Sequence, residues 1–314
     1  MNNELDLLHP SIFTGTKNLR ERFATARPFR HVVIDYFLAP LFCERLISDF
    51  PAFEERNAVD ELGQAGCKAV VPAMRRISSS YADFDRLMRA RAFRDWLGEV
   101  TAIGGLLYDR NYTGGGTHEN LDGQDLDWHV DFNYHPIRPL HRRLNLILFL
   151  NPVWKEQWGG CLEFHSDPWQ PEATPPGCMI LPIANTCVIF ETTESSWHGF
   201  QRIHLPEDGH FRSRRSIAVY FYTRSRPAAE TAPPHGTVYA QRGLPEHFVP
   251  EYTLGANDIE ELEVLLSRRD RQIRYLYERE RDFSEILTGI YHSPSFRLGR
   301  SLTWPLRKIL RNGR

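Results

Sequence analysis

The segment Trp128-His129-Val130-Asp131-Phe132 places a histidine and an aspartate two residues apart in an apolar context. On an extended strand, residues i and i+2 point to the same face, so His129 and Asp131 would present an imidazole and a carboxylate to one ion. Such a pair also arises by chance in a chain with 13 histidines. Its meaning therefore depends on the sequence that follows it.

Short apolar segments follow this pair at a spacing typical of β-strands. The clearest are residues 144–150, 161–165, 187–190 and 216–222, separated by glycine, proline, asparagine and aspartate. Strands of this length and number predict a sandwich or a barrel. Within the same region, His198 would complete a set of two histidines and one carboxylate. This donor set binds iron on one face and leaves three coordination positions open.

Helical segments flank the β-rich region on both sides. Residues 31–37 predict a strand that leads into a helix ending near residue 50, and apolar residues recur at helical spacing from about 83 to 103. After the strands, a proline-rich stretch at 226–234 precedes an amphipathic helix over 259–280, typical of a surface or short coiled-coil helix. We therefore expect an α+β fold. Its parts are a domain at 1–226 with a β core at about 104–226, a linker at 227–256, and a helical, basic extension at 257–314.

The ordered pattern from Tyr112 to Tyr222 resembles the double-stranded β-helix core of the iron(II)- and 2-oxoglutarate-dependent dioxygenases, and within them the prolyl 4-hydroxylase-like branch. The shared pieces are the HxD pair, a strand ending in Phe149-Leu150-Asn151, the Gly159-Gly160 turn, the distal His198, and a basic residue that begins the last strand. The resemblance implies a jelly-roll or cupin-like barrel with supporting N-terminal helices. It also implies that His129, Asp131 and His198 bind iron(II), that 2-oxoglutarate and O2 are cosubstrates, and that ascorbate is compatible as a reductant.

The activity that this resemblance implies is hydroxylation of an unactivated C–H bond, with release of succinate and CO2. A proline of a peptide or protein is the substrate that the branch suggests. A competing hypothesis is a glycan or sugar-linked metabolite of bacterial surface-polysaccharide synthesis, because the C-terminal segment resembles tails found on such enzymes. A third is a metal-binding β-barrel without oxygenase activity that acts as a docking module.

One departure from the family pattern affects the predicted 2-oxoglutarate site. Phe149 stands where a tyrosine often contacts the cosubstrate, and a phenyl ring cannot donate a hydrogen bond. Asn145, on the same strand face, and Ser216 are candidate replacements. Tyr112, ahead of the HxD pair, is a further candidate donor.

The basic residue that would bind the distal carboxylate of 2-oxoglutarate has two candidates, Arg214 and Arg215, because the loop after His198 is long. Arg214 shares its strand face with the small residues Ser216 and Ala218, which leave room for a ligand. Its guanidinium would bind a carboxylate through two parallel hydrogen bonds. We therefore prefer Arg214.

Three residues are candidates for contact with the substrate. Asn133 and His135 directly follow the predicted metal strand, and Arg143 belongs to the basic segment 138–143 beside the predicted entrance. Most of the other histidines, a group that includes His118, are expected to be hydrogen-bonded in the core or exposed to solvent.

The overall composition indicates an ordinary globular protein. Of the 314 residues, 38 are lysine or arginine and 40 are aspartate or glutamate, so no net field favours nucleic acid as a partner. Five cysteines without paired spacing argue against a disulfide framework and against a cysteine-based zinc site. No apolar run approaches the roughly 20 residues of a membrane span, and no leader pattern opens the chain. We expect a cytoplasmic enzyme without a nucleic-acid partner.

Two features of the C-terminal extension predict contacts with other molecules. The segment after Ile286 carries six basic residues and no acid, interleaved with apolar side chains, which suits peripheral contact with an anionic membrane. The alternative is an ordinary tail that packs back on the barrel. The helix at 259–280 is a candidate surface for oligomer formation.

Overall fold

The computed structural model describes residues 4–58, 68–169, 177–206, 213–240, 243–244 and 247–303. The chain divides into two compact units, residues 1–241 and 242–314. The described strands belong to the first unit, and two helices, α6 and α7, belong to the second.

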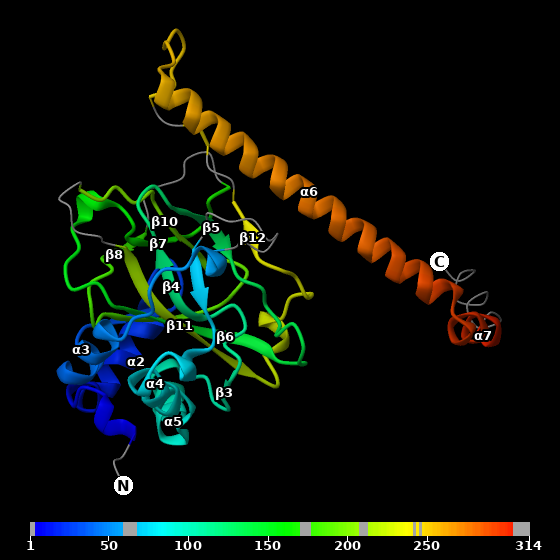
Figure 1. Cartoon of the computed structure of the whole chain (residues 1–314). Helices are drawn as coiled ribbons and strands as arrows, with labels where there is room; N and C mark the ends of the chain where they lie inside the picture. Colours follow the sequence, from blue (N-terminus) through cyan, green and yellow to red (C-terminus); the bar gives the residue numbers. More distant parts are fainter. Residues whose placement is uncertain are drawn as a thin grey trace. The chain divides into compact units, whose positions relative to one another are not determined.

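Two antiparallel sheets form the first unit (Figure 1). The larger sheet has the strand order β1-β9-β6-β11-β4-β2, and β3 pairs with β11. Its strands are β1 (His31–Ile34), β2 (Ala69–Val71), β3 (Leu107–Tyr108), β4 (Gly116–Asn120), β6 (His141–Phe149), β9 (Cys187–Glu191) and β11 (Arg214–Thr223).

The smaller sheet has the strand order β12-β5-β10-β7-β8. Its strands are β5 (Leu126–Val130), β7 (Leu162–His165), β8 (Cys178–Ile180), β10 (Trp197–Phe200) and β12 (Val238–Tyr239). An apolar cluster joins the two sheets, with Phe149 and Phe190 from the larger and Phe164 and Ile180 from the smaller. The two sheets are the halves of a double-stranded β-helix, which confirms the predicted fold class.

Helices cover the other face of the larger sheet (Figure 1). They are α1 (Ser11–Thr14), α2 (Thr16–Thr25), α3 (Pro40–Ser48), α4 (Ser79–Arg89) and α5 (Arg91–Thr101). The first unit also contains short 3-10 turns at Glu4–Leu7, Glu55–Asn57, Met74–Arg76, Glu156–Trp158 and Ala228–Glu230. Alternation along the central strands makes this packing possible, because Leu146 of β6 and Val219 of β11 point toward the helices. Each buried side chain of this size contributes about 1.5–3 kcal/mol.

The predicted helix over 83–103 is two helices in the structure. The hydroxyl of Ser78 caps the start of α4 by accepting the Tyr81 amide at 3.4 Å. Ala90 then adopts an extended backbone conformation that ends α4 and begins α5. Helical periodicity continues through this break, so the apolar pattern alone did not reveal it.

The proline-rich stretch packs on the first unit, whereas the sequence suggested that a linker begins at residue 227. The side-chain amide of Asn133 donates to the Pro233 carbonyl at 2.8 Å and accepts the His235 amide at 3.0 Å. Beyond it, β12 pairs with β5, and the Ala240 amide donates to the Trp128 carbonyl at 2.7 Å. We call residues 227–240 the strap. The sequence did not indicate these contacts, because the strap contributes backbone groups to them and has few apolar side chains.

The second unit consists of α6 (Ala256–His292) and α7 (Pro294–Leu302). Helix α6 begins where Asp258 accepts the Gly255 amide at 2.8 Å, and it extends well past the predicted range of 259–280. The described helices include none with the length and apolar character that a membrane crossing requires. The end of the predicted basic tail, from residue 304 onward, lies outside the described residues.

Candidate metal centre

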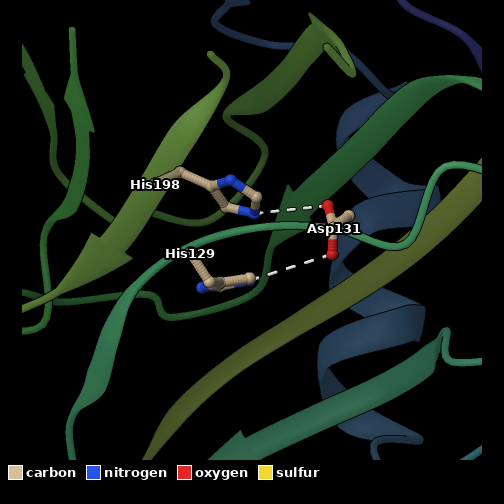
Figure 2. Close-up of side chains that lie close together, drawn as sticks. All are labelled: His129, Asp131 and His198. Atoms are coloured by element: carbon tan, nitrogen blue, oxygen red, sulfur yellow. Dashed lines mark ion pairs between the residues drawn. The ribbon is translucent and has the colours of Figure 1, made fainter. Parts of the chain in front are cut away.

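His129, Asp131 and His198 converge in the space between the two sheets (Figure 2). His129 on β5 pairs directly with His198 on β10, and Asp131 lies one residue beyond the end of β5. One ligand atom from each residue lies within 4.8 Å of the others. His129 Nε2 is 3.8 Å from Asp131 Oδ1, and His198 Nε2 is 3.5 Å from Asp131 Oδ2.

Backbone hydrogen bonds orient both imidazoles. The Nδ1 atom of His129 lies 2.9 Å from the Asp127 carbonyl, and the Nδ1 atom of His198 lies 2.9 Å from the Ser196 carbonyl. Because a carbonyl only accepts, each Nδ1 carries the proton and each Nε2 keeps its lone pair. This tautomer directs two nitrogen lone pairs toward the aspartate, as metal-binding histidines require.

Asp131 is fixed by two residues of β6. Arg142 Nη2 lies 3.1 Å from Asp131 Oδ2, and the Asn145 side-chain amide donates to the same oxygen at 2.7 Å. Arg142 is fully buried, and its guanidinium lies over the rings of Tyr220 at 3.5 Å and Phe132 at 4.3 Å. The carboxylate is therefore held in one orientation with Oδ1 on the side of His129.

Electrostatics keeps the three groups in the protonation states that bind a cation. Burial, together with the neighbouring His198, lowers the pKa of His129 to about 3. Burial also lowers the pKa of His198. Burial acts to raise the pKa of Asp131, but the charge of Arg142 and the hydrogen bond from Asn145 act against it, and that pKa lies below its usual range.

Arg214 lies on the inner face of β11 and is buried. Its guanidinium is 4.2 Å from the ring of Phe200, and its Nε donates to the Gly160 carbonyl at 2.6 Å. Gly160 has a φ of 68°, and a Cβ there would lie 3.0 Å from the Trp154 ring, so this turn needs glycine. Within the described part of the chain, Arg214 forms no ion pair, and burial lowers its pKa to about 10.

Arg215 has a different environment on the opposite face of β11. Its Nε lies 3.0 Å from Glu119 Oε1 in an ion pair, and its guanidinium lies over the ring of Phe50. Ile217, two residues later on the same face, packs in the core beneath the helices. Of the two candidate arginines, only Arg214 faces the space between the sheets. Ser216 shares that face and pairs with Phe149 and His118.

His118 is a residue of this site that the sequence analysis missed. It lies on β4 directly opposite Ser216, and its Nε2 is buried without a hydrogen-bond partner among the described residues. Burial holds its pKa well below the usual value, and positive charge on Lys68 and Arg214 acts in the same direction. His118 is thus an exception to the expectation for most of the other histidines. The one indication in the sequence was the short segment 116–120, which forms the strand β4 that carries His118.

Two residues predicted to contact 2-oxoglutarate have other surroundings or partners in the structure. Tyr112 has a φ of 51° in the turn before β4, and its ring packs against Tyr108 in the core beneath the helices. Asn145 lies in the site, but its amide nitrogen is used by Asp131 and its oxygen accepts both Nε and Nη2 of Arg142, at 3.0 and 2.8 Å. Asn145 therefore positions the carboxylate, and this uses one of the two N–H donors of its amide.

Two of the predicted substrate contacts also have structural roles elsewhere. Asn133 holds the strap. The Nδ1 atom of buried His135 accepts the amides of Ile137 and Arg138 at 3.1 and 3.2 Å, and its Nε2 lies 3.6 Å from an Asp109 carboxylate oxygen. His135 thus stabilises the turn between β5 and β6 and is not at an entrance.

Arg143 points away from the site because β6 contains a bulge. The pairing with β11 shifts by one residue between Leu144 and Arg142, which exchanges the faces of the residues before it. Arg142 consequently enters the site, whereas Arg143 pairs with Glu191 at 3.0 Å and Glu230 at 3.2 Å. The prediction for Arg143 rested on its place in the basic segment 138–143, and that segment does not reveal which of its arginines the bulge turns into the site.

These residues fit an iron and 2-oxo acid site by the chemistry of their side chains. Two neutral imidazole nitrogens and one carboxylate form the donor set typical of non-haem iron(II). Next to them are Arg214, a buried cation, and His118 Nε2, a buried nitrogen, neither of which has an ion-pair or hydrogen-bond partner for these atoms' charge or lone pair within the described ranges, apart from the bond of Arg214 Nε to the Gly160 carbonyl. Both indicate a bound ligand that carries a negative charge and hydrogen-bonding atoms.

Comparison with known proteins gives one match to a family. Residues 115–222, which contain the strands from β4 to β11, match the profile of the 2OG-Fe(II) oxygenase superfamily. No curated protein matches the chain.

Solved structures with some similarity include two prolyl hydroxylases and one protein with bound iron. A Trichoplax adhaerens prolyl hydroxylase in complex with a hypoxia inducible factor peptide fragment is 11% identical, with a TM-score of 0.44 over 73% of this chain and 100% of that chain. A Phytophthora capsici prolyl 4-hydroxylase is 16% identical, with a TM-score of 0.46 over 100% of this chain and 91% of that chain. HygX from Streptomyces hygroscopicus with iron bound is 11% identical, with a TM-score of 0.41 over 65% of this chain and 86% of that chain.

Proposed function

We propose that the chain is a 2-oxoglutarate-dependent dioxygenase that hydroxylates an unactivated C–H bond of a prolyl residue in a peptide. The match of residues 115–222 to the 2OG-Fe(II) oxygenase superfamily supports the reaction class. Iron(II), 2-oxoglutarate and O2 are its cofactor and cosubstrates. The choice of proline rests on the motif resemblance to the prolyl 4-hydroxylase-like branch.

In this proposal His129, Asp131 and His198 hold the iron. The ion, when bound, couples the oxidative decarboxylation of 2-oxoglutarate to activation of dioxygen. Arg142 and Asn145 keep the Asp131 carboxylate ionised and oriented, so the carboxylate does not have to reorient when the ion binds. The two backbone carbonyls fix the tautomers of the histidines.

The observation that carries the cosubstrate assignment is the buried guanidinium of Arg214, which lacks an ion pair among the described residues. A buried charge without a counter-charge is costly, and a carboxylate ligand would remove that cost. We assign Arg214 to the distal carboxylate of 2-oxoglutarate. Ser216 and the Nε2 atom of His118 lie beside it and would supply further hydrogen bonds.

The substrate would reach the iron beside the strap. Tyr239 of β12 pairs with His129, and the two rings lie 5.4 Å apart. Tyr239 is half-buried. An aromatic ring next to the metal suits the apolar, compact ring of proline. We assign Tyr239 to the substrate side of the site.

The proposal is tested by turnover of the iron-loaded protein with proline-containing peptides and, in parallel, with nucleotide sugars. We expect succinate release above the substrate-free background only with peptides, and a product heavier by one oxygen atom. Asp131→Ala should abolish both signals, whereas His204→Ala, at an exposed histidine, should change neither.

The outcomes separate the parts of the proposal. Iron-dependent succinate release that only nucleotide sugars stimulate would leave the reaction class intact and reject proline. Succinate release that persists at full rate in Asp131→Ala would reject the assigned metal ligands.

A further inference from the structure

Helix α6 carries an apolar seam along its entire length. We define the α6 seam as Ile259, Leu262, Leu266, Arg269, Ile273, Leu276, Glu280, Phe283, Leu287 and Ile290. Seven of its apolar members are between 48% and 57% exposed. The helix has 37 residues and a length of about 55 Å.

The spacing of the α6 seam alternates between three and four residues without interruption through five heptads. This is the a and d pattern of a coiled coil, in which the seam of one helix packs into the seam of another. Only two of the ten positions are polar, Arg269 at a d position and Glu280 at an a position. Their signs are opposite, which provides a test of the direction in which a second helix would run.

We propose that α6 forms an antiparallel coiled coil with α6 of a second copy of this chain. In an antiparallel pair each a residue faces a d residue of the partner. Ile273 then faces the partner's Leu276 at the centre, and Ile259 faces the partner's Ile290 at the ends. In this register Arg269 faces the partner's Glu280, and the two-fold axis repeats that pair.

One register satisfies three independent requirements. It covers every apolar member of the α6 seam with an apolar partner, it places the two polar members opposite each other, and it overlaps the helix Ala256–His292 over nearly its full length. Leu265 and Ile286, which flank the seam at g positions, also approach each other in this register. The same alignment of the two helices therefore accounts for all of these features.

A parallel pair fails the same requirements. It would place Arg269 against the partner's Arg269 and Glu280 against the partner's Glu280, two buried contacts between like charges. An antiparallel pair converts both into contacts between opposite charges. Polar residues within a coiled-coil seam are known to select orientation and register at some cost in stability.

The test is charge reversal at the two polar seam positions in the full chain, with the dimer dissociation constant measured by sedimentation equilibrium. Arg269→Glu should weaken the dimer about tenfold or more, because glutamate then faces glutamate twice in each dimer. Glu280→Arg should do the same through facing arginines. The double variant Arg269→Glu with Glu280→Arg should restore the wild-type constant. Arg274→Glu, an equal charge change on the exposed outer face, is the matched control and should have little effect.

Several results would overturn the proposal. The wild-type chain could remain a monomer at every concentration that it tolerates, including a monomer that sediments instead with vesicles of anionic phospholipid. Alternatively, the single reversals could leave the dimer unchanged, or the double reversal could fail to restore it while circular dichroism shows an intact helix. None of these measurements depends on iron or on turnover.

Discussion

At the scale of single residues, Arg214 should separate ligand binding from stability. We predict that Arg214→Met raises the KM for 2-oxoglutarate about 10- to 100-fold, because it removes charge-assisted hydrogen bonds to a carboxylate. The iron content should stay unchanged, because Arg214 is not a metal ligand. The free energy of unfolding of the ligand-free protein should stay equal or rise by about 1–3 kcal/mol, since an unpaired buried charge is removed. Steady-state kinetics and urea unfolding measure the two effects.

Arg215→Met is the matched control for this prediction. It removes the ion pair with Glu119 on the opposite strand face and should leave the KM for 2-oxoglutarate within about twofold of wild type. If Arg215→Met raised that KM and Arg214→Met did not, the assignment of the distal carboxylate would be wrong.

His118 should contribute one hydrogen bond to the bound cosubstrate. We predict that His118→Phe, which keeps a planar ring but removes Nε2, raises the KM for 2-oxoglutarate about 2- to 10-fold without loss of iron. His118→Gln places an amide nitrogen near the same position and should recover most of the loss. Equal defects in both variants would indicate a packing role instead.

At the scale of elements, the strands were predictable and their local irregularities were not. Residues 144–150 predicted β6, and the faces of β11 followed from simple alternation at Arg214 and Arg215. The bulge near Arg142 exchanged inside and outside at the start of β6, and it is set by pairing with β11, which a single sequence segment does not contain. The left-handed turn at Tyr112 likewise redirected a side chain that strand spacing had placed in the site.

The strap provides a prediction at this scale. Asn133→Ala removes two hydrogen bonds, to the Pro233 carbonyl and from the His235 amide, worth about 1–3 kcal/mol together. We expect amide hydrogens of residues 235–240 to exchange about 10- to 30-fold faster, which hydrogen-exchange mass spectrometry measures. Asn111→Ala, on an exposed turn, is the control and should not change exchange in the strap. Unchanged exchange in Asn133→Ala would show that β12 alone holds the strap.

At the scale of the whole molecule, the metal centre was predictable because its three ligands occur in a recognisable order along the sequence. His129 and Asp131 share one short segment, and His198 follows after a fixed succession of strands, so the family pattern brings them together. Arg142, Asn145 and His118 were not recognised in their roles. Their contacts depend on how β4, β6 and β11 align across the sheet. Supporting residues of a site are therefore harder to predict than its ligands.

The burial of three histidines in one site should make the metal-free protein sensitive to mild acid. His118, His129 and His198 have pKa values lowered chiefly by burial, to about 3 for His129. In the unfolded chain each histidine binds a proton below about pH 6.5, whereas the folded protein excludes it, so unfolding takes up protons. Stability should therefore fall as the pH falls below about 6.5, by roughly 1.4 kcal/mol per pH unit for each histidine.

Urea unfolding in the presence of a chelator, at pH 7.5 and 5.5, measures this dependence. His118→Gln removes one titrating group without changing a metal ligand, so it should reduce the pH dependence, to which His31 and His141 with their lowered pKa values also contribute. Asp131 does not contribute in this range, because its carboxyl is ionised in both states until the pH approaches about 4. A stability that is flat between pH 7.5 and 5.5 would mean that these histidines bind protons in the folded protein, and the neutral tautomers assigned to His129 and His198 would then be incorrect.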